Sequence, residues 1–164
     1  MTVFKQIVLN GATLSEFKFR REFELQGYLI AHPELLSLAE ANEDFEVLDL
    51  IGVERRLSKG RVDLVVEYKS GMIAIVELKK GKVVEKDLEQ LEKYLSDPAE
   101  FNKLKCLQDA KKGCLSKEFS FAFENKNVFG VLVGREIDGN VNAQIPGYKK
   151  AHKGRIVNAI SIRR

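Results

Sequence analysis

Residues 61–80 constrain the fold most strongly, because two apolar runs are separated there by a short turn. Residues 62–66 and 72–78 are rich in β-branched and aliphatic side chains, which favour strands. Residues 69–71 lie between them, and Gly71 can adopt the positive φ that a tight turn requires. The segment is therefore predicted to be a β-hairpin.

Three charged side chains occur where this hairpin should be apolar: Asp63, Glu77 and Lys79. With a three-residue loop Tyr68 pairs with Met72, and the same register places Asp63 opposite Glu77, with Cβ atoms about 5 Å apart. Lys79 lies two residues after Glu77 and shares its face of the strand. One face of the hairpin is then expected to carry two acids and an amine.

Two ionised carboxylates in a half-buried site repel each other and lose hydration, so a cation is needed to offset the cost. Oxygen ligands of this kind suit Mg²⁺ or Mn²⁺ rather than zinc. The alternative is that Asp63 marks a strand end, while Glu77 and Lys79 face solvent and form ordinary ion pairs. The spacing by itself leaves both interpretations open.

The length and composition are those of one globular domain. A chain of 164 residues can bury about two-thirds of its unfolded surface. No apolar run approaches the roughly 20 residues of a membrane span, and the N-terminus lacks the features of a signal peptide. We expect one cytoplasmic domain over residues 1–164 without a membrane partner. Its core should cover about residues 15–135, followed by a strand-rich extension over about 136–164.

Helical and strand-like patterns alternate around the hairpin. Helices are predicted over residues 15–31, 34–41, 84–96 and 99–112, and strands over 1–9, 45–57, 119–123, 128–133 and 155–162. Turns are expected at 138–139 and 146–147. The order predicts an α/β (mixed α+β) fold, in which helices flank one central mixed β-sheet.

The first of these helices carries a further candidate acid. Glu22 shares one helical stripe with Leu25 and Leu29, which should face the core. An acid on this stripe is unusual unless it has a polar partner, which could be a neighbouring basic residue. Glu24 is the competing candidate for a helix-borne acid.

The helix over 84–96 places Gln90 and Tyr94 four residues apart on one face. Taken together, the helix acid, Asp63, Glu77-Leu78-Lys79 and Gln90-x3-Tyr94 resemble the PD-(D/E)XK nuclease superfamily. The last two elements are similar to its RecB-like branch. More narrowly, residues 22–36, 60–64 and 76–81 resemble the nuclease domain of NucS/EndoMS-type endonucleases. The resemblance covers about residues 20–96 and implies a restriction-endonuclease-like core.

The resemblance implies a metal-dependent endodeoxyribonuclease that hydrolyses DNA phosphodiester bonds. Asp63 and Glu77 would bind the catalytic Mg²⁺ or Mn²⁺, with the Leu78 carbonyl and Glu22 completing the site. Such a site polarises the scissile phosphate and lowers the pKa of the attacking water.

Three further residues receive roles from the same resemblance. Lys79 would position or activate the attacking water, while Gln90 and Tyr94 would orient the site or the DNA strand. One departure is Val62, which precedes Asp63 where the superfamily name records proline. The mismatch endonucleases of this type also have an N-terminal dimerisation domain, for which the first fifteen or so residues leave no room.

Basic residues suggest how DNA would be held, and no nucleotide cofactor is expected. The DNA-binding candidates are Arg61, Lys80, Lys82, Lys149, Lys150, Lys153 and Arg155. A structure-specific nuclease acting on junctions, flaps or single strands is one alternative. A non-catalytic DNA-binding module is another, although such a module has no need of repelling carboxylates in its sheet. A homodimer is a further expectation, through apolar strands near residues 3–9 or 119–123, which could equally complete the monomer's own sheet.

Overall fold

The computed structural model describes residues 2–6, 8–9, 12–13, 21–38, 45–57, 59–96, 128–151 and 157–163. The predicted helix over 99–112 and the predicted strand over 119–123 lie outside these residues, as does the first part of the helix predicted from residue 15.

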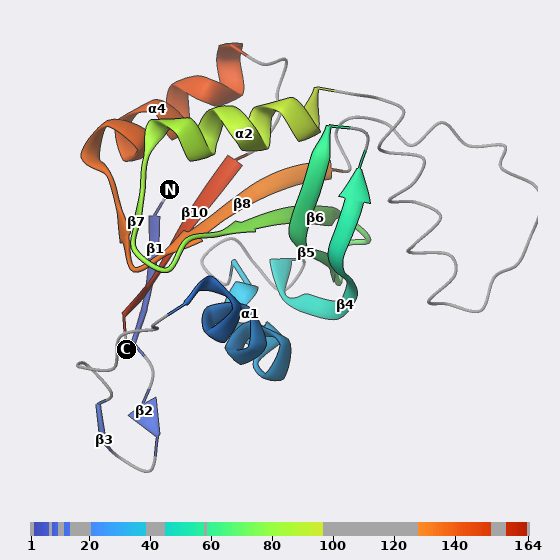
Figure 1. Cartoon of the computed structure of the whole chain (residues 1–164), viewed down its shortest axis with the longest axis vertical. Coiled ribbons are helices and arrows are strands. Elements are labelled where there is room, and N and C mark those ends of the chain that lie inside the picture. Colours follow the sequence, from blue (N-terminus) through green and yellow to red (C-terminus); the bar gives the residue numbers. More distant parts are fainter. Residues whose placement is uncertain are drawn as a thin grey trace, which may run out of the picture.

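A six-stranded mixed sheet forms the centre of the protein (Figure 1). Its order is β1 (Thr2–Gln6), β10 (Val157–Arg163), β8 (Val128–Gly134), β6 (Ile73–Leu78), β5 (Gly60–Tyr68) and β4 (Val47–Leu57). The first four strands run parallel, and β5 and β4 are antiparallel to their neighbours. The predicted mixed sheet is confirmed. Two small pairs join β2 (Val8–Leu9) to β3 (Ala12–Thr13) and β7 (Lys82–Val83) to β9 (Glu136–Ile137).

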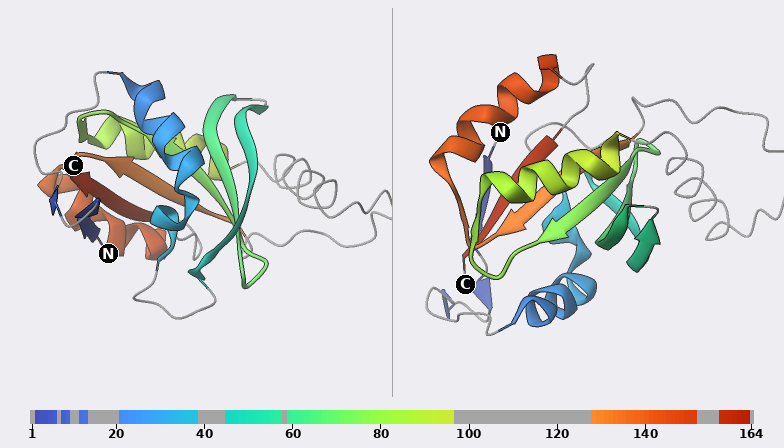
Figure 2. Two further views of the ribbon diagram at one scale, coloured as in Figure 1. Left: turned by 90° about the horizontal axis from the view of Figure 1, so that it is seen from below. Right: turned by 45° about the horizontal axis from the view of Figure 1, so that its top comes forward.

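Helices cover both faces of this sheet (Figures 1 and 2). The helix α1 (Glu22–Ala31) and the 3₁₀ turn η1 (Pro33–Leu36) lie on one face, and α2 (Glu85–Leu95) and α4 (Gly139–Ala151) lie on the other. No helix in the described part of the chain is long and apolar enough to cross a membrane.

Each face of the sheet has its own buried cluster, because alternate side chains of a strand point to opposite faces. Leu25 and Leu29 of α1 pack with Val76 on one face, and Leu91 of α2 packs with Ile75 on the other. All residues of β6 and β8 are buried. Continuous apolar runs are typical of strands covered on both faces, as the pattern at 128–133 predicted.

The central hairpin has the predicted register. Tyr68 N donates to Met72 O at 2.9 Å, and the ladder pairs Glu67 with Ile73 through to Leu64 with Val76. Gly71 has φ +80°, as the turn requires. The predicted strand over 45–57 and the predicted helix over 84–96 correspond to β4 and α2.

Two local predictions were wrong near α1 and α4. The helix expected from residue 34 ends as the single turn η1, since Ser37 instead accepts a hydrogen bond from Val47 N at 2.9 Å; residues 39–41 of that prediction lie outside the described residues. No turn occurs at 146–147, because α4 continues through both residues. Val141 and Ile145 of α4 are buried in the core, and this packing outweighs the low helix propensity of the Pro-Gly pair.

The C-terminal residues belong to the core. β10 lies between β1 and β8, with Ala159 and Ile160 fully buried, so residues 157–163 are not an extension added outside the sheet. The alternating pattern of these residues predicted a strand. Such a pattern does not indicate which other strands the predicted strand pairs with.

Candidate functional site

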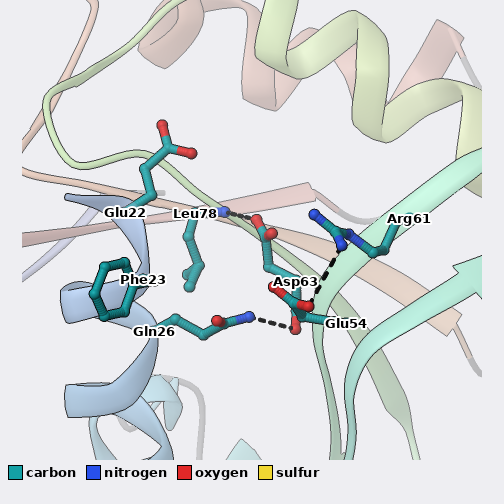
Figure 3. A pocket seen from close by; sticks show the side chains of 7 residues that line it. All are labelled: Glu22, Phe23, Gln26, Glu54, Arg61, Asp63 and Leu78. Carbon is teal, nitrogen blue, oxygen red and sulfur yellow. Dashed lines mark hydrogen bonds and ion pairs between the residues drawn. The ribbon is translucent and has the colours of Figure 1, made fainter.

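Asp63 lies where the β5–β6 ladder ends. The last backbone pair of the ladder is Leu64 with Val76. Beyond it the Asp63 side chain provides the hydrogen bond, and Asp63 Oδ2 accepts the Leu78 N–H at 2.7 Å (Figure 3). Gln26 Nε2 of α1 donates to the Asp63 carbonyl at 3.2 Å. Burial raises the pKa of Asp63, and the Leu78 N–H and the charge of Lys79 oppose this only in part. The carboxylate is therefore held beside the end of β6.

Glu77 projects from β6 toward α2 and is 4% exposed. Its Oε1 accepts a hydrogen bond from Gln90 Nε2 at 2.9 Å. Its Oε2 is buried and has no hydrogen-bond partner within the described residues. Burial, followed by the negative charge of Asp63, raises the pKa of Glu77 to about 7. An unsatisfied buried carboxylate oxygen calls for an explanation, such as a bound ion.

Lys79 follows β6 and lies between two carboxylates. Its Nζ is 3.5 Å from Glu77 Oε1 and 3.6 Å from Asp87 Oδ1. Burial lowers the pKa of this ammonium group, but the charges of Glu77, Glu22 and the other acids outweigh burial, so its pKa is raised. The strand pattern predicted that Glu77 and Lys79 share one face, and in the structure their side chains form an ion pair.

Gln90 and Tyr94 connect α2 to both strands of the hairpin. Gln90 Nε2, which donates to Glu77, also lies 3.3 Å from Tyr94 Oη, and Tyr94 Oη donates to the Arg61 carbonyl at 3.1 Å. Gly60 permits this approach, since a Cβ there would lie 2.5 Å from Tyr94 Oη. The pair thus anchors the start of β5 and orients the Glu77 carboxylate.

Glu22 is the first residue of α1 and lines a pocket of about 200 Å³. The lining residues are Glu22, Phe23, Gln26, Glu54, Arg61, Asp63 and Leu78 (Figure 3). Among the described residues no hydrogen bond or ion pair joins Glu22 to Asp63, but its negative charge helps raise the pKa of both Asp63 and Lys79. Glu22 is exposed rather than core-facing, unlike Leu25 and Leu29. Glu24 does not line this pocket.

Asp87 of α2 is the site residue that the sequence analysis missed. Its Oδ2 accepts the Val84 N–H at 2.9 Å, capping the start of α2, while Oδ1 faces Lys79 Nζ. The side chain is 8% exposed. An acid in the first turn of a helix is a common capping signal, so the sequence suggested nothing beyond a cap.

The side chains present fit a hard divalent cation, although the fit is incomplete. Asp63 and Glu77 supply carboxylate oxygens, and the buried Glu77 Oε2 has no hydrogen-bond partner in the part of the chain that the structure describes. In the described part of the chain, no three histidine, cysteine or carboxylate side chains form a ready-made metal-binding cluster. A cation at this position would therefore rely on backbone oxygen and water as well as on the two acids.

The structure describes the side chains of only some of the DNA-binding candidates. Arg61 NH1 lies 3.4 Å from Glu54 Oε2, and Lys82 Nζ lies 2.7 Å from Asp138 Oδ2. Lys80 follows Lys79 and is exposed. Lys149 and Lys150 lie in α4, whereas Lys153 and Arg155 lie outside the described residues.

The raised pKa of Glu77 predicts a pH-dependent stability. Between pH 4.5 and about 7 the folded protein retains a proton on Glu77 that the unfolded chain has released, so the free energy of unfolding falls as the pH rises through this window. Glu77→Gln removes the effect. Without divalent metal, we expect the variant to be more stable than wild type by about 2 kcal/mol at pH 8, because each pKa unit corresponds to about 1.36 kcal/mol and solvent screens part of it.

Urea denaturation at pH 4 and at pH 8 measures this difference. The two proteins should have nearly equal stability at pH 4, where Glu77 is protonated in both folded and unfolded wild type. A stability difference that does not change with pH would contradict the prediction.

Comparisons with solved structures find the same fold in repair endonucleases. The crystal structure of a repair endonuclease from Pyrococcus abyssi matches with a TM-score of 0.55 and 17% identity, covering 92% of this chain and 50% of that chain. The structure of an EndoMS–dsDNA2 complex matches with a TM-score of 0.56 and 14% identity, covering 98% and 48%. EndoMS in apo form matches with a TM-score of 0.51 and 14% identity, covering 90% and 48%.

The chain spans about half the length of these structures. No protein-family model and no curated protein matches it. At such low identity the likeness concerns the fold, and it agrees with the resemblance that the motifs suggested. The central mixed sheet, its two helical layers and these matches together show that the chain has the restriction-endonuclease-like fold of the NucS/EndoMS repair endonucleases.

Proposed function

We propose that this protein is a metal-dependent endonuclease that hydrolyses phosphodiester bonds in DNA. The convergence of Asp63, Glu77 and Lys79 at the end of β6 carries the proposal, because one buried carboxylate oxygen there has no partner within the described residues. A fold shared with repair endonucleases, including one solved with double-stranded DNA, supports DNA as the substrate.

Asp63, Glu77 and the Leu78 carbonyl would hold Mg²⁺ or Mn²⁺, with Glu22 acting at longer range through its charge. When bound, the ion supplies Lewis-acid stabilisation of the negative charge that develops on the phosphate. The hydrogen bond from Leu78 N–H fixes one Asp63 oxygen, and Gln90 fixes one Glu77 oxygen. The remaining oxygen of each carboxylate would be available to the ion.

Lys79 provides a positive charge at the same place. Its ammonium group is held by Glu77 and Asp87, and it would orient the attacking water and attract the phosphate. Gln90 and Tyr94 position Glu77 and the start of β5 without needing to contact DNA. The alternative of a non-catalytic binding module would give no reason for a buried carboxylate oxygen that has no hydrogen-bond partner among the described residues.

The direct test is cleavage of labelled DNA by the purified protein with Mg²⁺, with Mn²⁺ and with chelator. The panel should contain single-stranded, duplex, mismatched, flap and junction DNA. Cleavage that needs the metal and is absent in the Asp63→Ala protein is the expected result. Binding of DNA without cleavage under all these conditions would instead favour the binding module, and cleavage confined to flaps, junctions or single strands would favour a structure-specific nuclease.

Asp87 is expected to act by positioning Lys79. In Asp87→Asn the side-chain oxygen can still accept the Val84 N–H, but the Asn NH₂ would face the ammonium group in place of a carboxylate oxygen. We expect kcat to fall about 10-fold, with a smaller change in KM and in thermal stability. Asp87→Ala should lose the helix cap as well and destabilise the protein by about 1 kcal/mol. Equal kcat in wild type and Asp87→Asn would leave Asp87 as a cap alone.

Cleavage of both strands of a duplex would be simplest for a two-fold dimer with two such sites. β1 already pairs with β10, so residues 2–6 complete the sheet of one chain, but among the described residues no strand pairs with the other edge of β1. Residues 119–123 lie outside the described residues. We expect light scattering at micromolar concentration to give the mass of a dimer, and a monomer that makes paired cuts would contradict this expectation.

A further inference from the structure

Phe23 is an aromatic residue on the surface that lines the same pocket as Glu22 and Asp63. Its side chain is 59% exposed, although Leu25 and Leu29 of the same helix are buried. Phe23 lines the pocket that contains Asp63 (Figure 3). It is therefore not needed for the core, and part of it borders the pocket in which a phosphodiester would bind.

Two arginine side chains lie near the Phe23 ring or in the pocket that it lines. The guanidinium carbon of Arg21 lies 5.9 Å from the centroid of the Phe23 ring, within the range of a cation–π contact. Arg61 lines the same pocket and is held there by an exposed ion pair with Glu54. An exposed pair of this kind contributes little stability, so a phosphate could replace Glu54 as the partner of Arg61 at small cost.

Glu54 itself supports a functional interpretation of the pocket. It is the one non-glycine residue with positive φ among the described residues, at φ 48°. Such a conformation is strained and is found often where a side chain must be directed to a site. Here the Glu54 carboxylate contacts Arg61 at the pocket that holds Asp63.

An aromatic face beside positive charge is the combination that binds unpaired nucleotides, since a base stacks on the ring while the backbone phosphate meets the cations. A base inside a duplex already has both faces covered by its neighbours and cannot stack in this way. We propose that Phe23 stacks on an unpaired base next to the phosphodiester held at Asp63 and Glu77. The substrate class is then DNA with an unpaired nucleotide at the cleavage position, and this inference rests on the proposed function.

The test uses binding as well as cleavage. The full chain carrying Asp63→Asn, which prevents cleavage, is titrated into oligonucleotides with one 2-aminopurine, either unpaired or in a matched duplex. Stacking should change the fluorescence of the unpaired probe and leave the duplex probe unaffected. Adding Phe23→Leu should weaken binding of the unpaired probe about 5- to 100-fold and abolish the fluorescence change. Phe23→Tyr should retain both.

Ile30→Ala is the matched control, because Ile30 is a 40% exposed apolar residue of the same helix that does not line the pocket. It should bind both probes like the parent protein. An unchanged affinity for the unpaired probe in Phe23→Leu, or an equal loss for the two probes, would overturn the inference.

Cleavage by the protein with native Asp63 separates the two proposals. If that protein cuts DNA with metal and Phe23→Leu cuts unpaired and duplex substrates at the parent rates, the stacking role is wrong while the nuclease function stands. If the parent cuts nothing, the nuclease function fails. The fluorescence and affinity differences then still decide whether Phe23 binds an unpaired base.

Discussion

Replacing either Asp63 or Glu77 with alanine is expected to abolish metal-dependent DNA cleavage, with a loss of at least about 10³-fold in rate. Each substitution removes a carboxylate of the proposed metal site, and a loss of about 4 kcal/mol in transition-state stabilisation corresponds to this factor. Asp63→Asn and Glu77→Gln should lose cleavage as well, because a neutral amide binds Mg²⁺ far more weakly than a carboxylate does. Single-turnover cleavage of labelled DNA measures the rates.

The amide variants also show whether the fold is intact. The Asn side-chain oxygen can still accept the Leu78 N–H, and Gln at position 77 remains within reach of Gln90, so circular dichroism should be unchanged. Isothermal titration calorimetry with Mn²⁺ should detect binding to wild type and not to these variants. Cleavage at the wild-type rate by both Asp63→Ala and Glu77→Ala would remove the metal site from the proposal.

The helix acids provide a matched pair in the same experiment. Glu22→Gln should reduce cleavage, because Glu22 lines the pocket of Asp63 and its charge acts on both Asp63 and Lys79. Glu24→Gln removes the same charge from a residue that does not line the pocket and should cleave at nearly the wild-type rate. The reverse order of effects would favour Glu24 as the helix-borne acid.

Lys79→Met is expected to lower kcat by about 10² to 10⁴-fold, the usual contribution of a positioned group that orients or activates water. In contrast to the acid variants, it should bind Mn²⁺ at least as tightly as wild type, since a positive charge near the two carboxylates has been removed. Lys79→Arg should not restore the rate, because the planar guanidinium has a different shape and remains protonated.

Calorimetry and cleavage together distinguish this role from a structural one. Loss of Lys79 also leaves Glu77 and Asp87 without their shared cation, so some loss of thermal stability is expected, and the rates are to be measured well below the melting temperature. A Lys79→Met protein with wild-type kcat, or with both kcat and metal binding lost, would show that Lys79 has no separate part in the reaction.

Local patterns in the sequence were sufficient to predict the hairpin and the positions of Asp63 and Glu77 on it. The three-residue turn and the alternation of β5 and β6 set the register, and this register places Asp63 and Glu77 at one end of the strands. The apolar stripe of α2 likewise brought Gln90 and Tyr94 to one face. Such inferences succeed because turn geometry, strand alternation and helical period are properties of neighbouring residues.

Contacts between distant elements were decided by the tertiary structure alone. Asp87 was not identified because its contact with Lys79 depends on how α2 packs on the sheet. Only its capping of α2 could be expected from the sequence. Pro146 predicted a turn, yet α4 continues through it because Val141 and Ile145 are buried. The β5–β6 ladder also ends at the pair of Leu64 with Val76 and does not include Asp63. The Leu78 N–H instead donates to the Asp63 carboxylate.

The sequence by itself therefore determined that the hairpin brings Asp63, Glu77 and Lys79 together and that the following helix carries Gln90 and Tyr94 on one face, because these placements depend on local periodicity and turn chemistry. The tertiary structure decided which oxygen of each acid is already hydrogen-bonded, which partner holds Lys79 and that Phe23 borders the same pocket as Asp63. Those features depend on packing between elements far apart in the chain, where displacements of a few ångströms separate a contact from its absence and leave no trace in local patterns.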